Sequence, residues 1–256
     1  MDNNVKAKDL NDSAQDRDVM YQVSLLQSLV NGDYCGSITV AELKQHGDIG
    51  IGTFDGLNGE LIMLDGETYR AAGDGSVQAV SDHVTVPFSV VTFMDADKTE
   101  QLKEISCCDA LYNELDRMVE SRGKNQFYMI RIDGVFREIN VRSVYAQEGP
   151  YRRLTEVMEH DQTFFDYENI EGTIVGLYCP PYMSYLNAVG WHLHFISKDK
   201  TKGGHVLGLN IADAVLTWDD TDGFQVQLPQ NKTFSGFDLT ADQSEDIEKV
   251  EKRKKD

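Results

Sequence analysis

The stretch GWHLHFI spans residues 190–196, and GGHV follows it at residues 203–206. Side chains two positions apart on a β-strand share one face, so we expect His192 and His194 to project together while their neighbours face the core. The glycine pair that opens the second motif suits a chain reversal. A hairpin between the two motifs therefore predicts that His205 returns beside the other two histidines.

Three converging imidazoles are typical of one kind of metal site. Three histidines with an open fourth position form a common catalytic zinc site, whereas structural zinc sites are closed by four Cys or His ligands. No cysteine lies near the predicted hairpin, which favours the open arrangement. Other divalent ions also accept imidazoles, and a cluster of core or surface histidines that binds no ion is the alternative. His46, His83 and His160 lie in unrelated contexts, and we assign them no role.

The rest of the chain has the pattern of many strands and few helices. Asp-Gly and Asn-Gly turns separate short apolar runs, which predicts an α+β fold with two mixed or antiparallel β-sheet subdomains and a few flanking helices. The predicted strands are residues 48–54, 60–64, 68–72, 86–94, 127–132, 136–145, 172–178, 191–197, 205–218 and 223–228. The predicted helices are residues 40–46 with Thr39 as a cap, 103–121 and 152–159, and helical spacing also marks residues 21–34.

The chain is expected to divide into two subdomains. The expected parts are a disordered leader over residues 1–18, an N-terminal mixed-sheet subdomain over 19–165, and a C-terminal metal-binding β subdomain with a charged tail over 166–256. Within the first subdomain, Asp133-Gly134 predicts a hairpin turn. In the tail, Ile247 and Val250 are three residues apart and would form one small apolar face on a helical turn.

The charge of the chain limits its partners. Forty-three acidic residues against 24 basic ones leave a net charge of −19. Such a surface repels nucleic-acid backbones and anionic membranes, so we expect neither partner, although a metal ion and an arginine can still attract a small anionic substrate. No apolar run reaches the roughly 18 residues of a membrane span, and the polar N-terminus shows no secretory signal. The four cysteines form no C-x-x-C motif and predict reduced thiols in the cytoplasm.

Several motifs together resemble one enzyme family. They are GIGTFDGLNGEL at residues 50–61, FYMIRIDGVF at 127–136, GTIVG at 172–176 and the two histidine motifs. In this order and spacing, the chain resembles the α-acetolactate decarboxylases from about Tyr21 to Glu251. Two departures are visible, because Asn58 stands where the family often has Asp and Trp191 stands where Tyr is common. Neither position is a predicted ligand.

The resemblance implies a metal-dependent carbon–carbon lyase that uses no organic cofactor and works as a homodimer. It would convert (S)-2-acetolactate into (R)-acetoin and carbon dioxide, a step of acetoin biosynthesis. The zinc ligands that the resemblance implies are His192, His194 and His205. The residues that it places around the metal are Glu60, Arg142 and Glu251 as catalytic groups, Arg142 and Thr53 as substrate-binding groups, and Glu248 as a weaker candidate than Glu251.

These residue types suit the chemistry. Loss of carbon dioxide from a β-keto acid leaves an electron pair that must become an enolate, and zinc on the ketone and hydroxyl oxygens can stabilise it as a Lewis acid. The planar guanidinium of Arg142 can hold a carboxylate or a developing oxyanion. A carboxyl group such as Glu60 or Glu251 can deliver a proton to one face of the enediolate and so set the chirality of acetoin.

Two functions of other classes share the histidine hairpin. One is a cupin-like metal-binding module, and the other is a different three-histidine zinc hydrolase or binding module. Cupins usually add a glutamate a few residues after the second histidine, but residues 195–199 contain none. A pure binding protein would need neither Arg142 nor Glu60 near the metal. The positions of these two side chains therefore help to separate the alternatives.

Overall fold

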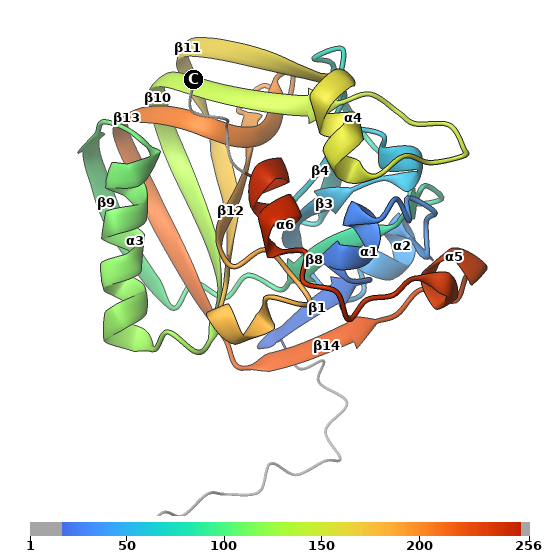
Figure 1. Ribbon diagram of the computed structural model, residues 1–256. Coiled ribbons are helices and arrows are strands. Elements are labelled where there is room, and N and C mark those ends of the chain that lie inside the picture. Colours follow the sequence, from blue (N-terminus) through green and yellow to red (C-terminus); the bar gives the residue numbers. More distant parts are fainter. Residues whose placement is uncertain (1–16, 252–256) are drawn as a thin grey trace, which may run out of the picture.

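The computed structural model describes residues 17–251, except for the side chains of Glu248 and Glu251 (Figure 1). The leader that we predict over residues 1–18 therefore lies, apart from its last two residues, outside the described part of the chain. Two large sheets carry most of the strands, and short helices flank them. The prediction of an α+β fold with mixed and antiparallel sheets is confirmed.

The larger sheet has seven strands. They are β1 (Val19–Val23), β3 (Ile49–Thr53), β4 (Glu60–Leu64), β5 (Glu67–Ala71), β6 (Val77–Ala79), β8 (Phe88–Thr92) and β14 (Gly223–Gln227). Their order in the sheet is β14-β1-β8-β3-β4-β5-β6. Only β1 and β14 pair in parallel, which makes this sheet mixed. Every residue of β3, β4 and β8 is buried, and for that reason their sequences lack the alternation of a half-exposed strand.

The second sheet is antiparallel and has five strands. They are β9 (Lys98–Ile105), β10 (Phe127–Val144), β11 (Gln162–Cys179), β12 (Gly190–Ser197) and β13 (Gly203–Thr221). β10 pairs with both β11 and β13, and β12 joins β11 to β13, so these four strands close into a ring of pairings. β9 adds to the sheet along β13. A core cluster that includes Tyr128, Phe195 and Trp218 packs within this sheet.

Short helices complete the fold. They are α1 (Leu26–Val30), α2 (Val40–Leu43), α3 (Cys108–Arg122), α4 (Leu154–His160), α5 (Lys232–Gly236) and α6 (Ser244–Glu251), with 3-10 turns η1 (Asp55–Leu57) and η2 (Pro181–Met183) and a strand pair β2 (Ile38–Thr39) and β7 (Thr85–Val86). α3 packs against β9 and β13, whereas α1, α4 and α6 contact one another (Figure 1). Thr39 caps α2 as predicted, because its hydroxyl accepts the N–H of Glu42 and the Glu42 carboxylate accepts the N–H of Thr39.

The predicted turn at Asp133-Gly134 is wrong, because both residues lie within the continuous strand β10. The Asp133 carboxylate accepts hydrogen bonds from the Thr173 hydroxyl at 2.7 Å and from the Arg131 guanidinium at 2.5 Å. It therefore links β10 to β11 instead of closing a turn. A Cβ atom on Gly134 would lie 2.3 Å from the Cβ of Ala214. Close packing of β10 on β13, and not a change of direction, explains the glycine.

Pairings between distant parts of the chain also change the predicted boundaries. β14 comes from the second predicted subdomain and pairs with β1, while β9 and β10 come from the first and belong to the second sheet. Residue 165 therefore does not separate the two sheets. The helix predicted from Lys103 begins at Cys108, because β9 occupies the preceding residues. The helical spacing over residues 21–34 divides into β1 and α1.

Asp219 is a buried carboxyl group at the junction of the two sheets. It lies on β13, and its Oδ1 accepts the N–H of Asp95 from the segment that connects β8 to β9. Its side chain is 1% exposed, and Oδ2 has no hydrogen-bond partner among the described residues. Burial raises the pKa of Asp219 to about 8, and the nearby carboxylates of Asp97, Asp95 and Asp18 contribute to the increase.

We predict that Asp219→Asn removes a pH-dependent loss of stability. The pKa of Asp219 is 3.8 in the unfolded reference and about 8 in the fold, so between these values the native state binds more protons and stability falls as pH rises. The slope reaches at most about 1.4 kcal/mol per pH unit. Urea unfolding from pH 5 to 9 should show the variant gaining stability relative to wild type up to pH 8. Asp213→Asn, at an exposed site on the same strand, is the control, and a gap that is constant with pH would contradict the prediction.

A candidate metal-binding active site

The histidines and Arg142 are placed by the register of three strands. His194 of β12 lies opposite His205 of β13, and Arg142 of β10 lies opposite His205 on the other edge of β13. His192 is two residues before His194 and shares its face of the strand. Gly204 permits this arrangement, because its φ is +148° and a Cβ there would lie 2.5 Å from the carbonyl oxygen of Arg142. The predicted hairpin and the convergence of its histidines are confirmed.

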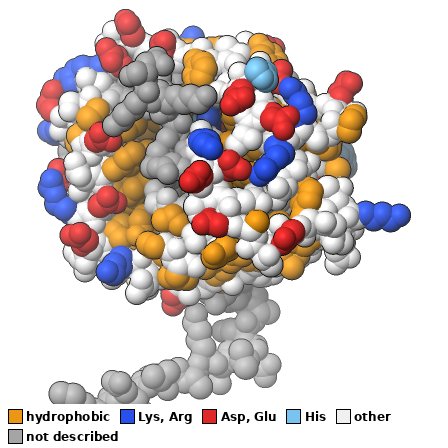
Figure 2. All heavy atoms as spheres, viewed as in Figure 1, with side chains coloured by type: hydrophobic (Ala, Val, Ile, Leu, Met, Phe, Trp, Pro, Cys, Tyr) orange, Lys and Arg blue, Asp and Glu red, His pale blue; other side chains and the backbone are white. Residues whose placement is uncertain are grey.

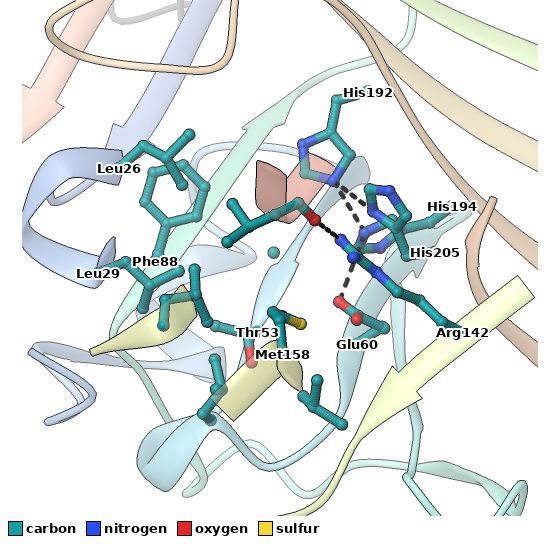
Figure 3. Close-up of a pocket in the computed structure, with 15 residues that line it drawn as sticks. Leu26, Leu29, Thr53, Glu60, Phe88, Arg142, Met158, His192, His194 and His205 are labelled. Atoms are coloured by element: carbon teal, nitrogen blue, oxygen red, sulfur yellow. Dashed lines mark hydrogen bonds and ion pairs between the residues drawn. The ribbon is translucent and has the colours of Figure 1, made fainter. Parts of the chain in front are cut away.

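The three imidazoles are buried and face one another (Figure 3). His192 Nε2 lies 3.1 Å from His194 Nε2 and 3.0 Å from His205 Nδ1. The three ligand atoms all lie within 4.8 Å of one another. A ring nitrogen carries at most one proton, so His192 Nε2 cannot form a good hydrogen bond with both of the other rings at once. Three convergent imidazole nitrogens are instead a suitable donor set for a divalent ion, so the residues fit a metal.

The protonation of the histidines favours metal binding. His194 Nδ1 lies 2.9 Å from the carbonyl oxygen of Leu61, and because a carbonyl only accepts, Nδ1 is the donor and Nε2 presents its lone pair to the site. Burial, with a contribution from the positive charge of Arg142, lowers the pKa of His192 to about 3. Burial and the neighbouring His192 and Arg142 place the pKa of His194 well below its ordinary value. Both rings are therefore neutral near pH 7, which is the form that binds a metal.

Two buried charged groups lie beside the imidazoles. Glu60 of β4 is 8% exposed, and its Oε2 lies 3.6 Å from His194 Nε2. Arg142 is 5% exposed, and its guanidinium donates a hydrogen bond to the carbonyl oxygen of Val250 on α6. Buried ionic groups are costly unless they are paired or bind a ligand, so their presence in one place is itself a sign of function.

One cavity of about 40 Å³ joins these groups. Its polar wall consists of Thr53, Glu60, Arg142, His192, His194 and His205. Its apolar wall consists of Leu26, Leu29, Leu57, Phe88, Val144, Leu154, Met158 and Val250, with Gly52 beside Thr53. The Thr53 hydroxyl donates to the carbonyl of Gly59 at 2.8 Å, which ties the end of β3 to the start of β4 next to Glu60. Ionic and metal-binding groups on one side, with hydrocarbon on the other, suit a small anion that carries alkyl groups.

The structure brings together most of the residues that the sequence singles out. The predicted roles of the two tail carboxylates stay predictions, because the side chains of Glu248 and Glu251 lie outside the described part of the chain. Ile247 and Val250 are both buried, which confirms the apolar face predicted for the tail. The sequence reasoning missed the apolar wall, including Met158, because a single apolar residue carries no chemical signature. The sequence predicted that Ile247 and Val250 form an apolar face of the tail, but only the structure shows that Val250 lines the cavity.

The face that Figure 2 shows carries charged side chains of both signs. Lys and Arg side chains there are scattered among Asp and Glu and form no single basic patch. Among the helices of residues 17–251, none is long and apolar enough to cross a membrane.

Comparisons with known proteins agree on one family. The family model for alpha-acetolactate decarboxylase matches residues 20–241. A relative of that name from Methanosarcina mazei is 42% identical over 235 residues, which cover 92% of this chain and 81% of the relative. The Bacillus subtilis (strain 168) relative is 37% identical over 233 residues, covering 91% of this chain and 90% of the relative. The crystal structure of alpha-acetolactate decarboxylase from Bacillus subtilis strain 168 has a TM-score of 0.88 at 36% identity and covers 92% of this chain and 100% of its own.

We predict that the three histidines hold one zinc ion per chain. His205→Ala removes one of three ligands and should weaken zinc binding at least about 10-fold, while the large apolar cores keep the fold. Bound zinc is measured by mass spectrometry after gel filtration and by competition with a chelating dye. His83→Ala, at an exposed position, serves as the matched control. Equal stoichiometry and affinity in both variants would refute the site.

Proposed function

Because this chain belongs to the alpha-acetolactate decarboxylase family and is a carboxy-lyase, we propose that it converts (S)-2-acetolactate into (R)-acetoin and carbon dioxide. We further propose that a divalent ion, zinc first, is held by His192, His194 and His205. One observation carries the proposal: a single cavity joins the three buried imidazoles to a buried arginine and a buried glutamate. A cupin-like module or a hydrolase does not account for this set as well as the family does.

The reaction requires stabilisation of the electron pair that the broken carbon–carbon bond leaves on the substrate. When carbon dioxide leaves 2-acetolactate, the electrons of the broken carbon–carbon bond move toward the neighbouring ketone and form an enediolate. The bound ion would supply Lewis-acid stabilisation of the negative charge on the substrate oxygens, so the proposal requires no organic cofactor. The overall balance is one acetolactate anion and one proton in, and one acetoin and one carbon dioxide out.

Arg142 binds and orients the substrate in this proposal. Its guanidinium presents planar paired N–H donors, which match the geometry of a carboxylate. The group is buried beside the imidazoles, so its attraction for an anion is little screened by solvent. Thr53 lines the same cavity and is proposed to contact the substrate from β3.

A carboxyl group supplies the proton. After carbon dioxide has left, the proton must reach the carbon that lost it, and the face that it reaches sets the chirality of acetoin. Glu60 is proposed for this step because its carboxyl group is buried in the cavity, 3.6 Å from His194 Nε2. Glu251 is the second candidate, on the family resemblance. The apolar wall holds the methyl groups and keeps water away from the enediolate.

The homodimer and the cytoplasmic location are also proposed. The dimer rests on the family resemblance alone. The location is supported by the cysteines, because Cys35, Cys107, Cys108 and Cys179 are all free thiols, as expected in a reducing compartment.

The experiment that tests the function supplies racemic 2-acetolactate to the zinc-loaded protein and measures acetoin by chiral gas chromatography, with and without a chelator. We predict that (R)-acetoin forms without the chelator and that its formation stops when the chelator is added.

Arg142→Lys keeps the charge but loses the planar donor pair, so kcat/KM should fall about 100-fold while bound zinc is unchanged. Arg137→Lys, at an exposed position of the same strand, should keep full activity. No acetoin with any divalent ion would overturn the function, and an Arg142→Lys rate within twofold of wild type would overturn the role of Arg142.

A separate prediction concerns the tail. Val250 lines the cavity and accepts a hydrogen bond from Arg142, so we expect deletion of residues 250–256 to remove most activity and deletion of 252–256 to have little effect. Glu251→Gln should reproduce the longer deletion if its carboxyl group takes part, and Glu248→Gln is the matched control. Steady-state rates at constant zinc content are the measurement. Full turnover by Glu251→Gln would leave Glu60 as the proton donor and would show that the longer deletion acts through Val250.

A further inference from the structure

The described wall of the cavity consists almost entirely of buried residues. Fifteen residues line it, and every one of them except Met158 is buried. Among the described lining residues, Met158 alone is half-buried and so combines contact with the cavity and partial exposure to solvent. Met158 is therefore the least buried point of the described wall, and we call this point the mouth of the cavity.

Contacts hold the backbone around Met158 in place, whereas methionine has an intrinsically flexible side chain. Leu154 and Met158 are one turn apart on α4, so both face the cavity. The Gln162 side chain donates a hydrogen bond to the Met158 carbonyl, and Arg153 at the start of α4 pairs with Asp246 of α6 at 3.0 Å. Methionine is unbranched and has three rotatable bonds, so it can swing aside without any movement of the helix.

The position of the side chain supports this reading. Figure 3 shows Met158 among the side chains that line the cavity, whose polar wall includes Thr53 and Glu60. Other lining residues lie on strands and on packed helices and are more deeply buried, such as Phe88 and Leu26, which are 3% and 2% exposed. Among the described lining residues, Met158 is thus the one that only partly packs against the core, so its side chain can give way with the least disturbance.

We propose that Met158 is the gate of the cavity and determines which 2-alkyl groups a substrate may carry. The proposal rests on the proposed function and deepens it, since it assigns a specificity-determining residue to the same reaction. A substrate with the methyl group of 2-acetolactate passes the gate, whereas each added methylene must displace the Met158 side chain further. The gate acts on access and fit, and it takes no part in bond breaking.

The test uses two substitutions of Met158 that should change the width of the cavity mouth in opposite directions. Met158→Ala shortens the side chain and widens the mouth, and Met158→Phe replaces a flexible chain with a rigid ring and narrows it. Met94→Ala is the matched control, because Met94 is also half-buried and packs against the same core cluster but does not line the cavity. All three are compared with the wild-type holoenzyme at equal zinc content.

Two measurements are made on each variant. The first is the ratio of kcat/KM for 2-ethyl-2-hydroxy-3-oxobutanoate to that for 2-acetolactate. A pocket discriminates one methylene by about 10-fold or more, so we expect Met158→Ala to raise the ratio about 10-fold and Met158→Phe to lower it. The second is the rate at which excess dipicolinate removes zinc, which needs no catalysis. It should rise several-fold in Met158→Ala and fall in Met158→Phe.

The outcomes separate the gate from the function. If no variant decarboxylates either acid, the proposed function fails, and the opposite changes in zinc-removal rate still decide the gate. If activity is present but both Met158 variants match Met94→Ala in the substrate ratio and in the removal rate, the gate is overturned. A change in the removal rate without a change in the ratio would overturn the assignment of specificity to Met158.

Discussion

The register of β12 against β13 is the constraint on which the site depends. It sets His194 opposite His205, and a slip of one residue would turn a whole strand of side chains to the other face. The ring of strands extends the same constraint, because β10 pairs with β13 and so brings Arg142 opposite His205. The larger sheet contributes β4 to the site, where the Leu61 carbonyl orients His194 and Glu60 lies beside His194.

This placement at the contact of two sheets has an energetic consequence. Imidazoles, a guanidinium and a carboxyl group are all removed from water, and this desolvation is the main cause of the lowered pKa of His192. A packed apolar interface would be more stable, so the chain maintains polarity here at the expense of stability, as functional sites commonly do. Binding of a metal ion to neutral imidazoles would return some of this free energy to the native state.

What the sequence could predict follows from the range of the interactions involved. The histidine hairpin is local, since the residues between its motifs include the turn itself, and it was predicted correctly. The Asp133-Gly134 turn was wrong because both residues serve contacts with strands far along the chain. For the same reason no local pattern could show that β14 pairs with β1. No sequence pattern around Glu60 or Arg142 marks either residue as functional, and both were identified from the family resemblance. Met158 could be identified only in the folded chain, from its partial exposure beside the cavity.

The net charge of −19 and a site for an anion are compatible because they act over different distances. At physiological ionic strength, charges on the surface are screened beyond about 8 Å, whereas the buried Arg142 would meet a bound carboxylate at contact distance and in a medium of lower dielectric constant. A polyanion needs many surface contacts, and each of them would meet the unfavourable field. A single small carboxylate needs one cation inside a cavity. The composition therefore argues against nucleic acids and anionic membranes without arguing against a substrate such as 2-acetolactate.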